Sequence, residues 1–492
     1  MVSAETPSPD MLATRPRAIT LVVFAPFGTD KALSTYPDGQ TQSVAAHPLL
    51  TNLRRVSELG VNVCALIDRV DDDSWLVTIP AHGSPTTVSN LKVDMASPRS
   101  LRGLLQLADE RFPRSAVVLA MEGHGAGYLP DIDASKLTVE SLTQAGSTEI
   151  EWTISSAGQT PTRSDDGEPL LPMGEPMLPM GEPMLPTNHY PISTWGMGWA
   201  LARYAESRKG GQSNIAVIHF NNCFNMSVEL LHCVAPFAKY ATGYSNYNFF
   251  TSGGSYPAAF GAFLQAPGGS AESLAQALAT ANRDVLAALP LSHPTVGSVV
   301  ALSRMNAIKA AIDALANALI DALPDNVGKI KAAIAQAQQY DTLGDFALDV
   351  PDEMTDIGSL ANILKNSALS PQVTHAASVL AQSLDGVFVY GVTASPWVSE
   401  NQTWALDNPR LAMNILLPDP ALAGRWDWRS PYYLETVPGR CVAQPNVIDF
   451  LRDSRWVEFI KKYHAGIPFL SLLAPRIPEY PVAVTRIYPR AR

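Results

Sequence analysis

Short apolar segments recur along the first half of the chain, and each has the length of a buried β-strand. They span residues 18–25, 61–68, 115–121, 215–220 and 239–244. Strands that are apolar throughout are typical of parallel sheets, because helices cover both faces of such a sheet. The pattern therefore predicts an α/β protein with a mostly parallel sheet flanked by helices.

Helical signals fill the intervals between these strands. Ser97 and Pro98 form an N-cap and first-turn pair, and apolar residues follow at helical spacing up to Ala108. A second helix is expected over residues 227–234, after the fourth strand. The alternation of strands and helices supports the parallel arrangement, because two parallel strands need a crossover connection.

The last third of the chain changes character and becomes largely helical. An amphipathic stripe begins at Ile308 and runs to Pro324, as in a helix that buries one face. Strand-like runs follow at residues 387–392 and 411–417, and a final helix is expected over about residues 447–463. The domain organisation that we expect is a flexible segment over 1–17, an α/β domain over 18–300, and a helical and mixed region over 301–492 that packs on it.

A seven-residue repeat separates the third and fourth strands. Its units begin at Glu168, Glu175 and Glu182, and each unit carries two prolines. Proline lacks the N–H group that helix interiors and central strands require, so the repeat is not a coiled coil. We expect an extended, polyproline-like insertion at about residues 160–190. It is either a flexible loop or a segment whose leucines and methionines lie on the protein surface.

Composition supports a large folded core and narrows the range of partners. Of the 492 residues, 46% are hydrophobic and 16% are charged, as in globular proteins. The net charge of −11 argues against binding to nucleic acid or to an anionic membrane, because both are negatively charged. The 4 cysteines show no C-x-x-C spacing, which argues against a disulfide framework or a structural zinc site. Residues 1–16 lack the features of a secretion signal and no apolar run is long enough for a membrane span, so a cytoplasmic protein is expected.

Two reactive side chains follow neighbouring strands of the predicted sheet. The third strand runs into Glu122-Gly-His-Gly-Ala-Gly127, and the fourth runs into Asn221-Asn-Cys-Phe224. Because the carboxyl ends of parallel strands meet at one edge of a sheet, we expect His124 and Cys223 to lie close together. An imidazole can take the proton of a thiol, leaving a thiolate nucleophile, and can then protonate a leaving amine. The N–H groups of Gly125 and Cys223 are candidates for an oxyanion hole.

Other histidines and cysteines compete for these roles. His219 lies inside the fourth strand, where a core or hydrogen-bonded position is expected for it. His232 and Cys233 fall on the following helix and are expected to pack against neighbouring elements. His189 follows the proline-rich repeat and is expected to be exposed.

A metal site is a different class of hypothesis for the same region. Glu122, His124, Asp131 and Asp133 are all residue types that ligate metal ions. Their spacing matches no known metal-binding motif, so no ligand set can be assigned from the sequence.

Both strand-end motifs resemble those of the clostripain family of caspase-fold cysteine peptidases. In that family a helix leads into a strand that ends in His-Gly-Gly-Gly, and residues 94–105 and 117–127 are similar to this arrangement. Residues 220–230 resemble the family's Asp-Ala-Cys-Leu-Met segment and the helix that follows it. The resemblance extends over about residues 18–463, and its further landmarks are residues 240–246, 252–256, 355–360 and 411–418.

This resemblance implies a caspase-like catalytic domain over residues 18–300, with Cys223 as the nucleophile and His124 as the general base and acid. It implies a thioester acyl-enzyme, no third catalytic residue and no cofactor for the chemistry, although calcium is compatible with the family. Family members are often cut between the histidine and the cysteine during activation, which makes Lys136 and Arg163 candidate processing sites. The expected substrates are one or a few intracellular proteins.

The chain departs from the family pattern beside both reactive residues. Asn221 stands two residues before Cys223, where the family usually has an aspartate that helps to hold a basic P1 side chain. Glu122 stands where the family commonly has Asp or Asn. An amide carries no charge to pair with Arg or Lys, so we expect a weaker preference for basic P1 residues. The candidate substrate-binding residues are Asn221, Glu122, Ser245 and Asn246.

Two alternatives follow from these departures. Another acid, from among Glu122, Asp131 and Asp133, would supply the missing charge near the substrate. Alternatively, the chain is a catalytically inactive caspase-fold module that binds a partner protein. The retention of both His124 and Cys223 favours the enzyme.

Overall fold

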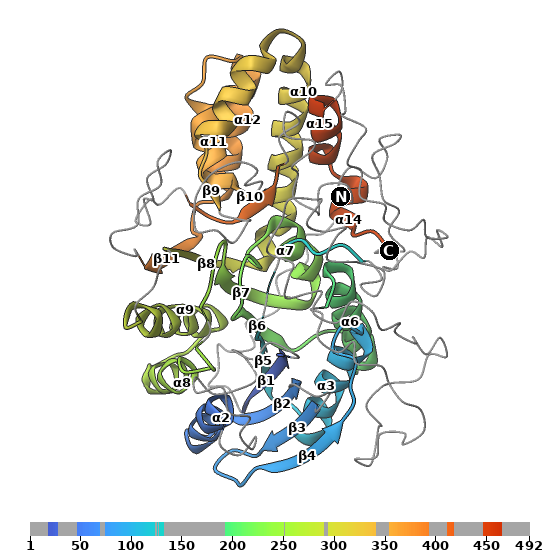
Figure 1. Ribbon diagram of the computed structural model, residues 1–492, viewed down its shortest axis with the longest axis vertical. Coiled ribbons are helices and arrows are strands. Elements are labelled where there is room, and N and C mark those ends of the chain that lie inside the picture. Colours follow the sequence, from blue (N-terminus) through green and yellow to red (C-terminus); the bar gives the residue numbers. More distant parts are fainter. Residues whose placement is uncertain are drawn as a thin grey trace, which may run out of the picture.

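A mixed β-sheet runs through the lower half of the molecule in Figure 1. The computed structural model describes residues 18–27, 47–68, 74–123, 125, 127–131, 192–249, 251–289, 294–340, 354–392, 411–417 and 446–464. Within these residues, nine strands form one sheet in the order β11-β8-β7-β6-β5-β1-β2-β3-β4. The central strands are parallel, namely β1 (Ile19–Pro26), β2 (Asn62–Asp68), β5 (Ala116–Met121), β6 (Ile215–Phe220) and β7 (Ala238–Tyr244). The structure therefore confirms the five predicted strands and the predicted fold class, a mostly parallel sheet flanked by helices.

Both edges of the sheet are antiparallel. β3 (Ser74–Ile79) and β4 (Thr86–Leu91) extend it beyond β2, while β8 (Thr295–Ala301) and β11 (Phe388–Val392) extend it beyond β7. The apolar run at residues 387–392 predicts β11, but the sequence pattern does not predict the other three. β4 and β8 carry Ser, Thr or Gly at several positions and therefore lack a continuous apolar run.

Helices cover both faces of the sheet. One face is packed by α2 (Pro48–Glu58), α8 (Tyr256–Gln265) and α9 (Ala271–Ala287), and the other by α3 (Pro98–Arg111), α6 (Thr194–Ser207) and α7 (Val228–Val234) (Figure 1). Alternate residues of β1 divide between the two cores, with Val23 on the first side and Phe24 on the second. Burial on both sides explains why β1 is apolar throughout.

The helix starts follow the signals in the sequence. The Ser97 hydroxyl accepts from the N–H of Arg99 at the start of α3, and Pro98 occupies the first turn. The Ser227 hydroxyl likewise accepts from the N–H of Leu230 at the start of α7. A 3₁₀ turn, η4 (Ala235–Phe237), follows α7.

A helical region occupies the upper half of Figure 1. After the 3₁₀ turn η5 (Leu302–Arg304), the long helix α10 (Met305–Gln336) carries the predicted apolar stripe, and α11 (Ile357–Lys365) and α12 (Pro371–Ser383) pack beside it. The helix continues past Pro324, with a kink at Asn326, where φ is −135° and ψ is 19°. A second, three-stranded antiparallel sheet has the order β12 (Asn414–Leu416), β10 (Met354–Asp356), β9 (Gln339–Tyr340).

The single helix predicted over residues 447–463 is wrong, because the structure has two helices there. α14 (Asp449–Asp453) ends before Ser454, and α15 (Arg455–His464) begins after it. The Ser454 hydroxyl accepts from the N–H of Trp456 at 3.0 Å and donates to the carboxylate of Asp313 on α10 at 2.9 Å. A serine that bonds a nearby backbone N–H favours a helix start over a helix interior.

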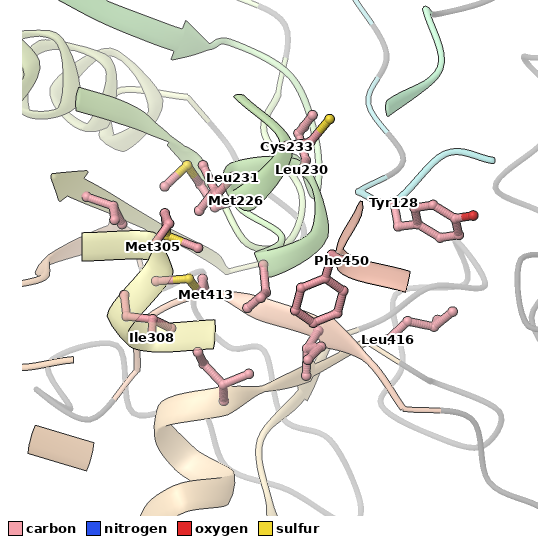
Figure 2. Close-up of a cluster of buried hydrophobic side chains, with 14 of the residues drawn as sticks. Tyr128, Met226, Leu230, Leu231, Cys233, Met305, Ile308, Met413, Leu416 and Phe450 are labelled. Atoms are coloured by element: carbon pink, nitrogen blue, oxygen red, sulfur yellow. The ribbon is translucent and has the colours of Figure 1, made fainter. Parts of the chain in front are cut away.

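A buried apolar cluster joins α7 to the helical region (Figure 2). Leu231 of α7 and Met226 lie in the same cluster as Met305 of α10, Met413 beside β12 and Phe450 of α14. The segment that follows Cys223 is therefore packed against the C-terminal elements as well as against the sheet. Across the described residues, none of the helices combines the length and the apolar character that a membrane crossing requires.

Candidate active site

The ends of β5 and β6 bring two loops together at one edge of the sheet. Met121 pairs with Phe220 in the parallel register, and the N–H of Asn221 donates to the Met121 oxygen at 2.9 Å. The glycine-rich segment that begins at Glu122 and the segment that contains Cys223 leave the sheet from these adjacent positions. This is the arrangement that the sequence predicts.

The two loops are in direct contact where Gly125 meets Cys223. A Cβ atom at Gly125 would overlap the main-chain oxygen of Cys223 and lie 3.0 Å from the Asn222 side chain. Further along, the N–H of Gly127 donates to the Asn225 side-chain oxygen at 3.1 Å. Only glycine allows so close an approach at residue 125. His124 itself lies outside the described residues.

Cys223 is partly exposed, and two backbone atoms of Asn248 contact its sulfur. The N–H of Asn248 lies 3.4 Å from Cys223 Sγ, and the thiol lies 3.4 Å from the Asn248 carbonyl oxygen. Asn248 follows β7, the next strand of the parallel set. Backbone atoms at the same sheet edge therefore hold the Cys223 sulfur, and the residue remains partly exposed.

Phe224, directly after the cysteine, adopts a left-handed backbone conformation with φ of 58°. This conformation costs a non-glycine residue about 1–2 kcal/mol. Two hydrogen bonds hold the turn, since the Phe224 N–H donates to the Asn246 oxygen at 2.9 Å and its carbonyl accepts from the Asn414 amide at 2.8 Å. Strained backbone that is held in this way is typical of functional sites.

Glu122 and Asn221 are buried and bonded to each other. The Asn221 amide donates to both Glu122 oxygens, at 3.0 and 3.1 Å, and the Tyr256 hydroxyl donates to Glu122 as well. Burial raises the pKa of Glu122 to about 7, although the bonds from Tyr256 and Asn221 oppose the rise. The two side chains are only 1% and 4% exposed, so in this structure they satisfy each other and do not face a substrate.

Ser245 and Asn246, the other substrate-binding candidates, are also buried. The Asn246 amide donates to the Pro294 oxygen at 2.8 Å, and its side-chain oxygen accepts from the Val296 N–H at 2.7 Å. The N–H of Ser245 donates to the Val296 oxygen. Both residues are 0% exposed and tie the end of β7 to β8, so the expectation that they contact substrate conflicts with their burial.

The other described histidine and cysteine candidates are His219, His232 and Cys233, and each packs against or bonds to neighbouring elements. His219 is buried in β6 beside Tyr256, and burial lowers its pKa to about 3, so its ring is neutral. On α7, the His232 ring packs edge-on against Phe450, and the Cys233 thiol donates to the Thr194 oxygen. These are the packing roles that the sequence indicates for these residues.

Several predicted residues fall on parts of the chain that the structure does not describe. They are His124, Asp133, Lys136, Arg163, His189, residues 1–17 and the repeat at residues 160–190. Within the described part of the chain, no group of three or more His, Cys, Asp or Glu side chains is placed to hold a metal ion. The Asp131 carboxylate accepts from Ser193 and Asn446.

Sequence reasoning missed two residues that organise this edge. Asn248 holds the sulfur of Cys223, and Asn414, far along the chain, donates to the oxygens of Phe224 and Ser245. Asn248 had a usable signal, because polar residues follow the apolar run of β7 just as they follow β5 and β6. Asn414 had none, since it lies in a short apolar segment whose partners are distant in sequence.

Comparisons with known proteins identify the family to which the chain is similar. A family model, Peptidase_C11 of the clostripain family, matches residues 203–463, which include Cys223 and exclude His124. No curated protein matches the sequence. This chain is similar in structure to a secreted C11 cysteine protease from Bacteroides thetaiotaomicron named "iotapain", with 11% identity, a TM-score of 0.48, and coverage of 82% of this chain and 94% of that one.

An inactive zymogen of a C11 protease from Parabacteroides distasonis has 12% identity and a TM-score of 0.48, with coverage of 82% and 93%. The Bacteroides thetaiotaomicron protease in complex with an irreversible peptide inhibitor has 12% identity and a TM-score of 0.46, with coverage of 81% and 92%. Because the family model spans more than half of the sequence, the chain belongs to the clostripain family of caspase-fold cysteine peptidases and is a cysteine-type endopeptidase that acts on peptides or proteins.

Proposed function

We propose that Cys223 is the nucleophile of this peptidase and that His124 is its general base and acid. The observation that carries the proposal is the contact between Gly125 and Cys223, which joins the two strand-end loops. His124 is the residue directly before Gly125 in the sequence. A second support is the partial exposure of Cys223, since a nucleophile must be reached by a substrate.

The proposed reaction uses side chains, backbone N–H groups and water. His124 takes the Cys223 proton, and the thiolate attacks the peptide carbonyl carbon to give a tetrahedral oxyanion. The N–H groups of Gly125 and Cys223 are the proposed oxyanion donors. The imidazolium then protonates the leaving amine as the C–N bond breaks, which leaves a thioester. Water, deprotonated by the imidazole, hydrolyses the thioester and restores the thiol.

We further propose that the peptidase has a weaker preference for basic P1 residues than is usual for its family. The amide at Asn221 carries no charge, and both it and Glu122 are turned inward and bonded to each other. Asp131 is 5% exposed and accepts from Ser193 and Asn446, so it is also engaged. Asp133 stays a candidate acid from the sequence. A P1-diverse fluorogenic library tests this, and a strong preference for Arg over all uncharged residues would overturn it.

The proposed domain organisation is a catalytic domain over residues 18–300 and a region over 301–492 that packs on it. The bonds from Asn414 to the nucleophile loop and the apolar cluster of Figure 2 support close packing. We also propose limited proteolysis of intracellular targets, and activation by cleavage at Lys136 or Arg163. Mass spectrometry of the purified protein tests activation, because an intact chain with full activity would reject obligatory processing.

Labelling by a peptidyl acyloxymethyl ketone tests the catalytic pair. Such a reagent alkylates an activated active-site thiol, so the wild type is expected to be labelled at Cys223 and the Cys223→Ala variant not at all. His124→Ala is expected to lose most labelling and peptidase activity, by roughly 10²–10⁴-fold. Cys233→Ala is a matched control on the same loop–helix unit, and full activity of Cys223→Ala would overturn the assignment.

A further inference from the structure

A chain of buried amides ends at the sulfur of Cys223. We propose that the main-chain N–H of Asn248 stabilises the Cys223 thiolate and that Asn282 is a positioning residue that holds Asn248 in place. The inference rests on the proposed role of Cys223 as the nucleophile. It assigns a source of thiol activation that is separate from His124.

Asn248 places a donor and an acceptor beside the sulfur, one for each ionisation state of the thiol. The thiol can donate to the Asn248 carbonyl oxygen at 3.4 Å, whereas a thiolate can only accept, and the Asn248 N–H lies 3.4 Å away. A hydrogen bond to an ionised acceptor is roughly twice as strong as a neutral one, and S–H is a weak donor. The N–H favours the thiolate, whereas the carbonyl oxygen alone would favour the thiol; because the bond from the N–H to a thiolate is the stronger of the two, the thiolate gains more.

Buried side-chain amides fix the position of Asn248. Its amide donates to the Asn221 oxygen at 2.9 Å, and its own oxygen accepts from the Asn282 amide at 3.3 Å. Asn282, on α9, also donates to the Tyr244 hydroxyl at 2.8 Å. Asn248 is 8% exposed and Asn282 0%, so a broken link would leave a buried polar group without its partner.

The amide chain links four elements of the fold. Asn221 follows β6 and bonds Glu122 after β5, Asn248 follows β7, and Asn282 belongs to α9. The Asn248 backbone N–H and carbonyl oxygen each lie 3.4 Å from the sulfur. The common effect of these side-chain bonds is to orient the Asn248 backbone, which is the role of a supporting shell around a reactive group.

Four of the described ionisable groups around this chain are Glu122, Tyr244, Tyr256 and His219; Tyr390 and Arg283 also act on Tyr244. Burial raises the pKa of Tyr244 and Tyr256 well above 10, and burial lowers the pKa of His219 to about 3. Glu122, whose pKa burial raises to about 7, is the one among the four that titrates near neutrality. A Glu122→Gln background removes this titration and keeps an oxygen that accepts from Asn221 and Tyr256.

The test is the pH profile of Cys223 alkylation by iodoacetamide, followed on the Cys223 peptide by mass spectrometry, in the full chain with Glu122→Gln. Asn248→Ala is expected to move the midpoint up by about one pH unit, with a rate about tenfold lower below the midpoint and an unchanged plateau at high pH. Asn282→Ala is expected to shift the midpoint in the same direction by a smaller amount. This variant replaces Asn248→Ala as the test if Asn248→Ala does not fold.

Tyr244→Phe is the matched control. It removes a buried hydrogen bond from Asn282 but leaves the bonds of Asn248 intact, so its midpoint is expected to equal that of the background. If Asn248→Ala and Asn282→Ala also match the background, the proposal is overturned. That result differs from failure of the proposed function, which appears as peptidase activity that survives Cys223→Ala.

Discussion

The side-chain amide of Asn414 donates a hydrogen bond to the main-chain oxygen of Phe224, 190 residues earlier in the chain. The same amide donates to the Ser245 oxygen at 2.7 Å, and the Asn414 N–H donates to the Met226 oxygen at 3.0 Å. Asn414, in strand β12 of the small sheet, therefore links the loop that follows Cys223 to the end of β7.

Asn414→Ala is expected to impair catalysis more than substrate binding. The substitution leaves the Phe224 and Ser245 oxygens without a buried donor, at a cost of about 1–3 kcal/mol, and releases the left-handed turn beside Cys223. We expect kcat to fall by roughly 10-fold or more while KM changes little. Steady-state kinetics check this, and Asn362→Ala, whose side chain is not part of these contacts, is the control for a general loss of stability.

Exchange of the acid and the amide at positions 122 and 221 is expected to be cooperative. Asn221→Asp alone places two carboxylates about 3 Å apart in a buried site, and like charges there cannot both ionise. Added Glu122→Gln restores a donor and an acceptor across the pair. The single variant is expected to lose a few kcal/mol of unfolding free energy and the double variant to recover most of it. Urea unfolding of the four combinations measures the coupling, and strictly additive effects would contradict it.

The raised pKa of Glu122 predicts a pH-dependent stability. Burial lifts the pKa from 4.5 to about 7, so between these values the folded chain binds more protons at Glu122 than the unfolded chain does. The contribution of Glu122 to the unfolding free energy is then largest below pH 4.5. It declines by a few kcal/mol as the pH rises through 7. His219, with its lowered pKa, acts in the opposite direction between about 3 and 6.5, and buried Asp356, with a pKa raised to about 6, acts in the same direction as Glu122.

Glu122→Gln isolates the contribution of Glu122, because His219 and Asp356 are unchanged in it. The difference in unfolding free energy between the wild type and this variant is expected to fall from pH 4.5 to pH 7. Chemical denaturation at a series of pH values provides the measurement. A difference that is constant over this interval would show that Glu122 titrates normally.

A methyl group at Gly125 is expected to separate the two loops that follow β5 and β6. In Gly125→Ala the new Cβ overlaps the Cys223 oxygen and presses on Asn222, so one loop must move. We expect kcat/KM to fall by roughly 100-fold, as for small displacements of catalytic groups. In the control Gly328→Ala, the new Cβ meets nothing within 4 Å on helix α10, and stability is expected to rise by about 0.5–1 kcal/mol with unchanged activity.

The central sheet was predictable because burial on both faces leaves a continuous apolar run, as in β1 and β6. The capped starts of α3 and α7 were predictable because Ser97 and Ser227 act locally. The break at Ser454 was not, since Ser454 also bonds Asp313 on a distant helix. A local sequence pattern predicts local hydrogen bonds. The helix break at Ser454 also depends on a tertiary contact, so the local pattern does not predict it.

Some features of the candidate site were likewise predictable from the sequence, and others were not. The juxtaposition of the loops after β5 and β6 follows from parallel topology, which the sequence indicates. The burial of Asn221, Glu122 and Asn246 does not, because polar residues at strand ends are equally suited to contact substrate or to bond one another. Only the packing of neighbouring elements, such as Tyr256 on α8 against Glu122, decides between the two.

The long separation between Phe224 and Asn414 also bears on how the protein is made. A nascent chain still held by the ribosome before β12 emerges has Cys223 but lacks the donors that brace the turn beside it. If Cys223 is the nucleophile as proposed, we expect proteolytic competence to arise late in synthesis, after β12 has joined the fold.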